Sequence, residues 1–147
     1  MTTMTMTPTT ESTETQAGSV DWRLAHVRAA FGYLMTKPEK RDLEQRQRLF
    51  GPDFEIFGPA RENCGSLPAS RPGHDLFTGF SDSELDLTDM VTSGDRVISY
   101  VSFRGRHTGE FEGHQPTGRL MAADGMVVHR FGSDGRIAEQ WSVLRWR

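Results

Sequence analysis

The amino-acid sequence predicts an α+β fold in which a strongly curved antiparallel sheet carries two to three N-terminal helices across its concave face. The main observation is a period-two alternation along residues 97–104, 126–131 and 137–144, which is typical of half-buried β-strands. A second observation is the helical spacing of apolar residues over 21–34. Helices packed on one face of a curved sheet form a cone with a cavity open at one end.

The first half of the chain contains the expected helices. A helix over 21–34 begins with Asp21 as N-cap and ends before Pro38, because a residue that precedes proline is pushed out of the helical region. A second, charged helix is expected over 39–49, and one or two further helical turns over 75–80. The apolar stripe of the first helix consists of Trp22, Ala25, Ala29, Ala30 and Tyr33.

Turn residues indicate where the segments between the predicted helices and the sheet begin and end. A short strand is expected over 54–57 and a polar loop over 61–73, and loops of this length are often functional. Residues 85–92 form the first long strand, which a turn at 93–95 leads back into the next one.

The closing hairpin allows a prediction of register. With Asp134 and Gly135 in the turn, His129 lies opposite Gln140, about 5 Å away between Cβ atoms. The next pair, Arg130 and Glu139, can then form an ion pair on the other face of the sheet.

Composition limits the classes of function. A chain of 147 residues with 35% apolar and 25% charged residues suits one globular domain, expected over 20–147 after a disordered Thr-, Ser- and Glu-rich leader over 1–19. The net charge of −3 gives no electrostatic case for nucleic acid. No apolar run approaches the roughly 20 residues that span a membrane. The single cysteine, Cys64, is compatible with the reducing cytoplasm.

Motifs for metals and cofactors are absent from the sequence. The five histidines show no metal-ligand spacing, and neither a phosphate-binding Walker loop nor a Gly-x-Ser-x-Gly nucleophile motif occurs. We therefore expect no metal and no cofactor.

Four motifs in order resemble the SnoaL-like polyketide cyclases, which belong to the nuclear transport factor two-like and ketosteroid isomerase-like superfamily. These motifs are Gly105-x-His107-Thr108-Gly109, Pro116-Thr117-Gly118-Arg119, Arg130-Phe131 and Gly135-Arg136-Ile137-x-Glu139-x-Trp141. The resemblance implies the curved-sheet fold, a hydrophobic small-molecule substrate, and a homodimer formed through the outer face of the sheet.

The chain departs from this family at one functional position. The resemblance implies an aspartate near Arg145 that acts as base in an intramolecular aldol closure. A guanidinium remains protonated in proteins and cannot act as that base. We therefore do not expect the aldol mechanism in this protein, but we do expect a pocket for a polyketide-like molecule.

Three residues are candidates for the catalytic groups. His129 has a reference pKa near working pH, with Gln140 to orient it or the substrate. Asp89, in phase with Leu85 and Leu87, would be a carboxylate that enters an apolar face, where burial raises its pKa. The alternatives are a histidine on the sheet surface whose hydrogen bonds are made by neighbouring groups, and an aspartate that faces water.

Further residues are candidates for substrate binding. Aromatic rings can stack on a flat ligand or pack in the sheet, and polar residues near loop ends can contact substrate or anchor a turn. The candidates are Trp22, Tyr33, Tyr100, His107, Arg119, Trp141 and Ser142.

The sequence favours a cofactor-independent cyclase of natural-product biosynthesis that closes a ring without the aspartate-based aldol step. An isomerase or epoxide hydrolase acting on a similar substrate is the enzymatic alternative. A small-molecule-binding protein or a dimeric interaction module is the alternative without catalysis.

Overall fold

The computed structural model describes residues 19–57, 63–66, 69–70 and 76–147. The leader expected over 1–19 lies outside them except for Ser19, and so does much of the loop expected over 61–73. The elements are helices α2 (Val20–Leu34), η1 (Pro38–Lys40), α3 (Leu43–Leu49) and α4 (Leu76–Gly79), and strands β1 (Phe50–Phe57), β2 (Asn63–Ser66), β3 (Ala69–Ser70), β4 (Phe80–Ser93), β5 (Arg96–His107), β6 (Leu120–Phe131) and β7 (Ile137–Trp146).

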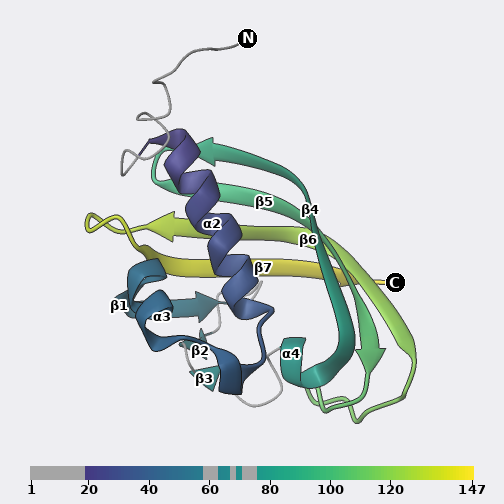
Figure 1. Cartoon of the computed structure of the whole chain (residues 1–147). Coiled ribbons are helices and arrows are strands. Elements are labelled where there is room, and N and C mark those ends of the chain that lie inside the picture. Colours follow the sequence, from purple (N-terminus) through teal and green to yellow (C-terminus); the bar gives the residue numbers. More distant parts are fainter. Residues whose placement is uncertain (1–18, 58–62, 67–68, 71–75) are drawn as a thin grey trace.

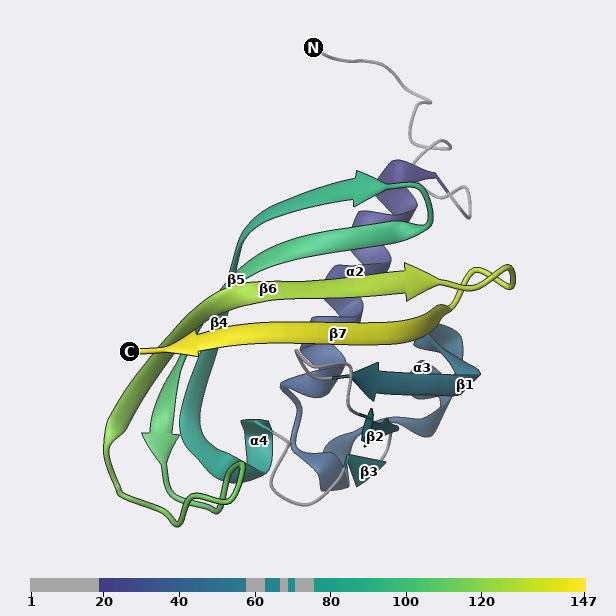
Figure 2. The ribbon, with the colours of Figure 1, turned by 180° about the vertical axis from the view of Figure 1, so that it is seen from behind.

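The strands form one curved sheet in the order β3-β2-β1-β7-β6-β5-β4. The long strands β4 to β7 run antiparallel to one another and bend together, while α2 crosses their concave face (Figures 1 and 2). The predicted α+β class is confirmed. The expectation of a wholly antiparallel sheet is wrong at one junction, because β1 pairs with β7 in parallel.

The helices differ in detail from their predicted bounds. Ser19, not Asp21, is the N-cap of α2, because its hydroxyl oxygen accepts a hydrogen bond from the Trp22 backbone N–H at 3.1 Å. The second helix is split, since Pro38–Lys40 forms a single 3-10 turn and α3 begins only after the N-cap Asp42. The predicted stripe of α2 is also wrong in part, because Ala25 and Ala29 are exposed.

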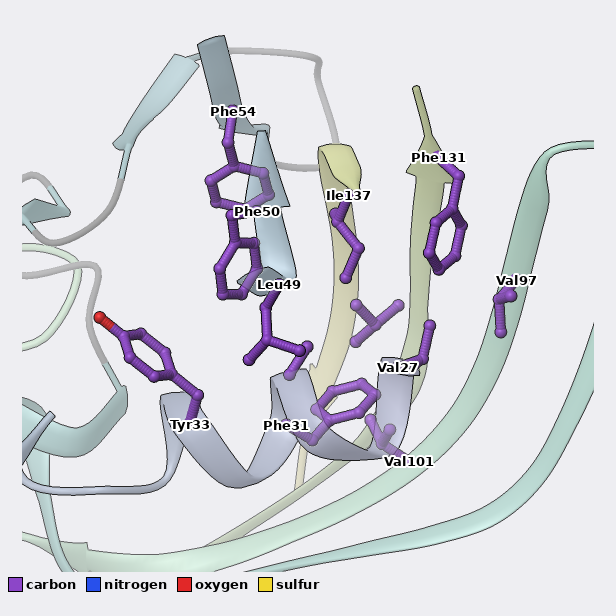
Figure 3. Packing of buried hydrophobic residues seen from close by; sticks show 12 residues of the cluster. Val27, Phe31, Tyr33, Leu49, Phe50, Phe54, Val97, Val101, Phe131 and Ile137 are labelled. Carbon is purple, nitrogen blue, oxygen red and sulfur yellow. The ribbon is translucent and has the colours of Figure 1, made fainter. Parts of the chain in front are cut away.

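The main core lies between α2 and the concave face of the sheet. Figure 3 shows Val27 and Phe31 of the helix pointing toward side chains of β1, β5, β6 and β7. A second, smaller cluster joins Phe80, Phe103 and Phe111 at the α4 end of β4 and β5, with Trp146 packed against it. The fully buried members of the main core include Val27, Phe50, Phe54, Val97, Val101 and Ile137.

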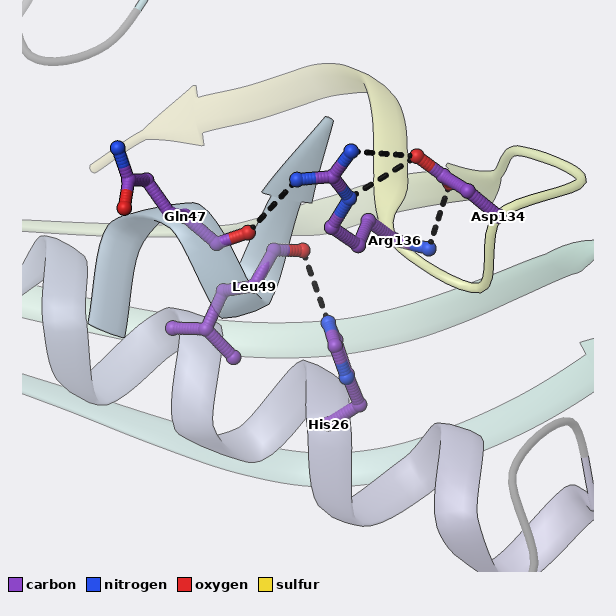
Figure 4. A network of polar contacts seen from close by, with 5 residues as sticks. All are labelled: His26, Gln47, Leu49, Asp134 and Arg136. Carbon is purple, nitrogen blue, oxygen red and sulfur yellow. Dashed lines mark hydrogen bonds and ion pairs between the residues drawn. The ribbon is translucent and has the colours of Figure 1, made fainter. Parts of the chain in front are cut away.

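Polar contacts fasten the two helices to the β6–β7 turn (Figure 4). The His26 Nε2 atom lies 2.8 Å from the Leu49 carbonyl oxygen, which joins α2 to the end of α3. The Arg136 guanidinium donates to the Gln47 carbonyl oxygen at 2.9 Å and pairs with Asp134 at 2.9 Å. These contacts hold both helices over one end of the sheet.

Candidate functional site

The concave faces of β5, β6 and β7 form a floor beneath α2. Alternate residues of these strands are buried, and the pairing places His129 between Val97 of β5 and Gln140 of β7. The predicted pairing of His129 with Gln140 and of Arg130 with Glu139 is confirmed. The predicted ion pair also forms, with Arg130 Nε 3.1 Å from Glu139 Oε1.

His129 is the central polar group of this floor. Its side chain is fully buried, and its Nε2 atom lies 2.9 Å from the carboxamide oxygen of Gln140. Because that oxygen can only accept, Nε2 carries the proton and donates, which leaves Nδ1 as the unprotonated nitrogen. Nδ1 has no hydrogen-bond partner among the described residues.

The environment keeps His129 neutral. Burial lowers the pKa of His129 from 6.5 to about 4, the hydrogen bond to Gln140 acts in the opposite direction, and the nearby His26 lowers the pKa further. The imidazole is therefore uncharged at neutral pH, and its Nδ1 lone pair is free to accept a proton.

A second buried polar group on this floor is Ser99. It pairs with Val127 of β6, which also pairs with Ser142 of β7, so the row Ser99–Val127–Ser142 lies beside the row that contains His129 and Gln140. The Ser99 side chain is fully buried, and its hydroxyl has no partner among the described residues. Ser99 is not among the residues predicted from the sequence, although a serine in phase with Val97 and Val101 is a signal of a polar group on an apolar face.

Phe31 of α2 covers the imidazole. Its ring lies edge-on to His129, with centroids 5.2 Å apart and an interplanar angle of 88°. This ring contributes to the burial of the imidazole.

Two aromatic candidates lie on the wrong face of the sheet. Tyr100 is 48% exposed and alternates with the buried residues of β5, so it points away from the floor. Trp141 lies beside Gln140 on β7 and therefore faces the opposite side, where the Arg96 guanidinium lies 5.3 Å from its ring centroid. Neither residue can share a pocket with His129.

Asp89 also lies outside the floor. It is exposed, and its Oδ1 accepts a hydrogen bond from the backbone N–H of Met90 at 2.9 Å. A register shift between Leu87 and Asp89 breaks the alternation, so the expectation that Asp89 enters an apolar face is wrong.

The remaining candidates are scattered. Tyr33 is buried against Phe50 in the core, with ring centroids 5.7 Å apart. Trp22 lines a rim cleft of about 520 Å³ together with Phe131 and the β6–β7 turn, but neither His129 nor Gln140 contributes to it.

His107 and Arg119 lie at the other end of β5. His107 is buried, with Nδ1 3.2 Å from the Thr117 hydroxyl oxygen and its ring 5.3 Å from that of Phe80. Arg119 is exposed, and its carbonyl oxygen accepts from the His107 backbone N–H at 2.9 Å. Both contacts anchor the segment between β5 and β6.

The described residues offer no obvious place for a metal or for a membrane span. No group of three or more His, Cys, Asp or Glu side chains in that part of the chain is arranged to hold a metal ion. None of the helices described is long and apolar enough to cross a membrane.

A match to a family model identifies the protein family to which this chain belongs. The model of the SnoaL-like polyketide cyclases matches residues 34–144, which include β1, the whole meander from β4 to β6, and most of β7. The chain belongs to this family. No curated protein sequence matches it.

Solved structures agree with this SnoaL-like fold. IdmH of Streptomyces antibioticus, provisionally described as a polyketide cyclase, is 30% identical, with a TM-score of 0.52 over 81% of this chain and 91% of IdmH. A provisionally described SnoaL-like polyketide cyclase from Jannaschia sp. CCS1 is 18% identical, with a TM-score of 0.64 over 82% and 85%. A Catenulispora acidiphila protein with a ketosteroid isomerase-like fold, solved with trimethylamine, is 14% identical, with a TM-score of 0.58 over 80% and 83%.

The structure also places Arg145, which stands where the family resemblance implies an aspartate. Arg145 pairs with Asp124 across β6 and β7 and is exposed on the face away from His129. In this SnoaL-like chain the polar groups of the floor around His129 are Ser99, Gln140 and Ser142.

Proposed function

We propose that this SnoaL-like protein is a cofactor-independent cyclase of natural-product biosynthesis, which closes a ring on a hydrophobic polyketide-type substrate. The observation that supports this most directly is the buried pair His129 and Gln140, because it holds one imidazole nitrogen as a donor and leaves the other as a base. The apolar residues around it exclude water from such a reaction.

In the proposed reaction, a hydroxyl or enol of the substrate transfers its proton to His129 Nδ1 while its oxygen or α-carbon attacks an electrophilic carbon of the same molecule. The imidazolium then returns the proton to the atom that received the displaced electron pair, so the product is an isomer of the substrate. Since a pKa of about 4 makes His129 a weak base, the electrophile must already be activated, as an enone or an epoxide is. Proximity in the pocket supplies much of the remaining acceleration.

Two alternatives use the same floor. Isomerisation or epoxide hydrolysis on a similar substrate would need the same proton transfer at Nδ1. The complete burial of His129, with the Phe31 ring against it, favours a different class, a small-molecule-binding protein without catalysis, because the imidazole is closed to solvent in this structure.

The proposed activity is tested with 2′-hydroxychalcone, whose phenol closes onto its enone to give the isomeric flavanone. We expect the protein to accelerate this closure and to give one enantiomer in excess, because a chiral pocket fixes the face of attack. His129→Gln removes the base and lowers the rate by about 100-fold or more. His114→Gln, at an exposed histidine outside the floor, is the matched control and keeps the rate. A chalcone that binds but closes at the background rate would contradict the enzyme and favour the binding protein.

We also propose that the protein acts as a homodimer in the cytoplasm. Tyr100, Met126 and Val143 pair in one row across the outer face of β5, β6 and β7, and each is about half exposed. An apolar row of this kind on a sheet face fits the self-complementary interface of a symmetric dimer.

A further inference from the structure

We infer that Ser99 and His129 together bind a single hydroxyl or enol group of an uncharged substrate, with Ser99 Oγ donating to its oxygen and His129 Nδ1 accepting its hydrogen. The inference rests on the proposed function, because it names the group that the same site takes. It adds Ser99 as a residue that determines specificity.

Two buried polar atoms of the floor lack a hydrogen-bond partner among the described residues, and one must accept a hydrogen while the other can donate one. Ser99 and His129 are both fully buried, and neither Ser99 Oγ nor His129 Nδ1 has a partner among the described residues. Buried polar groups are nearly always hydrogen-bonded, so each of these atoms calls for a partner from outside the described chain. Because Nε2 already donates to Gln140, Nδ1 can only accept, whereas the serine hydroxyl has a hydrogen to donate.

The register makes Ser99 and His129 diagonal neighbours on one face of the sheet. Val97 lies directly opposite His129, and Ser99 is two residues further along β5 on the same face. Such diagonal neighbours have Cβ atoms roughly 7 Å apart or somewhat less. A single ligand oxygen that makes a hydrogen bond of about 2.8 Å to each side chain fits between neighbours at this Cβ separation.

The chemistry of the floor excludes other groups. A carbonyl oxygen would satisfy Ser99 but would offer no hydrogen to Nδ1. A carboxylate or phosphate would lose its hydration without gaining a cation, because the inward-facing residues of β5, β6 and β7 include no lysine or arginine. A hydroxyl or enol both accepts and donates, and it is uncharged.

Isothermal titration calorimetry of the full chain with three naphthalenes tests this inference. 2-Naphthol carries the hydroxyl, 2-methoxynaphthalene keeps the oxygen without its hydrogen, and 2-naphthoate carries a charge. We expect 2-naphthol to bind about 10-fold more tightly than the methyl ether and 2-naphthoate to bind most weakly. Ser99→Ala should weaken 2-naphthol binding by about 3- to 10-fold, because the hydroxyl oxygen loses its donor, and the ether, whose oxygen accepts from the same donor, should lose no more than 2-naphthol does.

Ser102→Ala is the control, since Ser102 lies on the same strand but faces the other side, where it donates to Asp124 at 2.6 Å. It should leave all three affinities unchanged. An unchanged affinity for 2-naphthol in Ser99→Ala, equal affinities of the wild type for 2-naphthol and the ether, tightest binding of the naphthoate, or no binding of 2-naphthol would each overturn the inference.

The test separates the inference from the proposed activity. If 2-naphthol shows the expected pattern while chalcone closure does not occur, the binding assignment stands and the cyclase fails. If closure depends on His129 while Ser99→Ala leaves the affinity for 2-naphthol unchanged, the cyclase stands and the role of Ser99 fails.

Discussion

The Nε2 atom of His129 lies 2.9 Å from the Oε1 atom of Gln140, inside a core where both side chains are shielded from water. This one hydrogen bond fixes which imidazole nitrogen carries the proton. Gln140, which lies opposite His129 in the hairpin, thus determines that Nδ1 is the nitrogen that can act as a base. The β6–β7 hairpin is therefore the part of the fold that positions His129 and its hydrogen-bond partner.

Replacing Gln140 should disturb this arrangement without removing the base. In Gln140→Leu the Nε2–H loses its acceptor, and the imidazole is no longer held in one tautomer. We expect the rate constant of chalcone closure to fall on the order of 10-fold, with a smaller change in KM. Gln115→Leu, at an exposed glutamine, is the control. An unchanged rate constant in Gln140→Leu would show that Gln140 does not orient His129.

The stability of the protein should depend on pH through His129. Burial lowers the pKa of His129 from 6.5 to about 4, so between these pH values the unfolded chain binds a proton that the native protein does not. The free energy of unfolding therefore falls as the pH drops through this window, by about 2 kcal/mol at pH 5 from this group alone.

Urea unfolding at pH 7.5 and pH 5 measures this effect. His129→Gln lacks the titrating group, so its stability should fall by about 2 kcal/mol less than that of the wild type over the same interval. An equal loss in both proteins would mean that His129 titrates normally in the native state.

Gly125 should be required for the close pairing of β6 and β7. A Cβ at this position would overlap the Val143 carbonyl oxygen and would lie 2.9 Å from the Leu144 Cα. Gly125→Ala should lower the free energy of unfolding by about 2 kcal/mol or more, because backbone atoms of β7 must move. Gly32→Ala, on the exposed side of α2 with nothing within 4 Å, should raise it by about 0.5–1 kcal/mol. Thermal unfolding of both variants checks the contrast, and a Gly125→Ala protein as stable as the wild type would contradict this account of the strand contact.

The proposed dimer should dissociate when a charge enters its apolar row. Met126 lies between Tyr100 and Val143 and is 49% exposed. Met126→Glu should give a monomer in sedimentation velocity, because a carboxylate at the centre of an interface loses its hydration. Leu120→Glu, which is 64% exposed but lies at the start of β6 outside the row, should remain dimeric. A monomeric wild type at micromolar concentration would contradict the proposal.

The sequence was sufficient to predict the fold class and the register of the last hairpin. Alternation identifies the long strands, and the turn around Asp134 and Gly135 fixes which residues face each other. The same alternation contains Ser99 in an apolar phase, so this residue could have been selected as well.

Other features depend on tertiary structure that local patterns do not contain. The irregularity between Leu87 and Asp89 turns the carboxylate outward, and a single shift of this kind leaves no clear trace in the sequence. The parallel pairing of β1 with β7 joins distant segments, which periodicity cannot detect. The helix start at Ser19 was missed because serine and aspartate are both good N-cap residues, so residue type alone does not identify which of them caps the helix.

The proposed site depends on His129 being a neutral base with its proton on Nε2 and its lone pair on Nδ1. Nitrogen-15 NMR of the histidine side chains at pH 6, with His129→Gln to assign the signal, measures this directly. The account predicts an uncharged ring protonated at Nε2, and a change in the Nδ1 shift when 2-naphthol is added and donates to it. An imidazolium, or a neutral ring with its proton on Nδ1, would contradict the account.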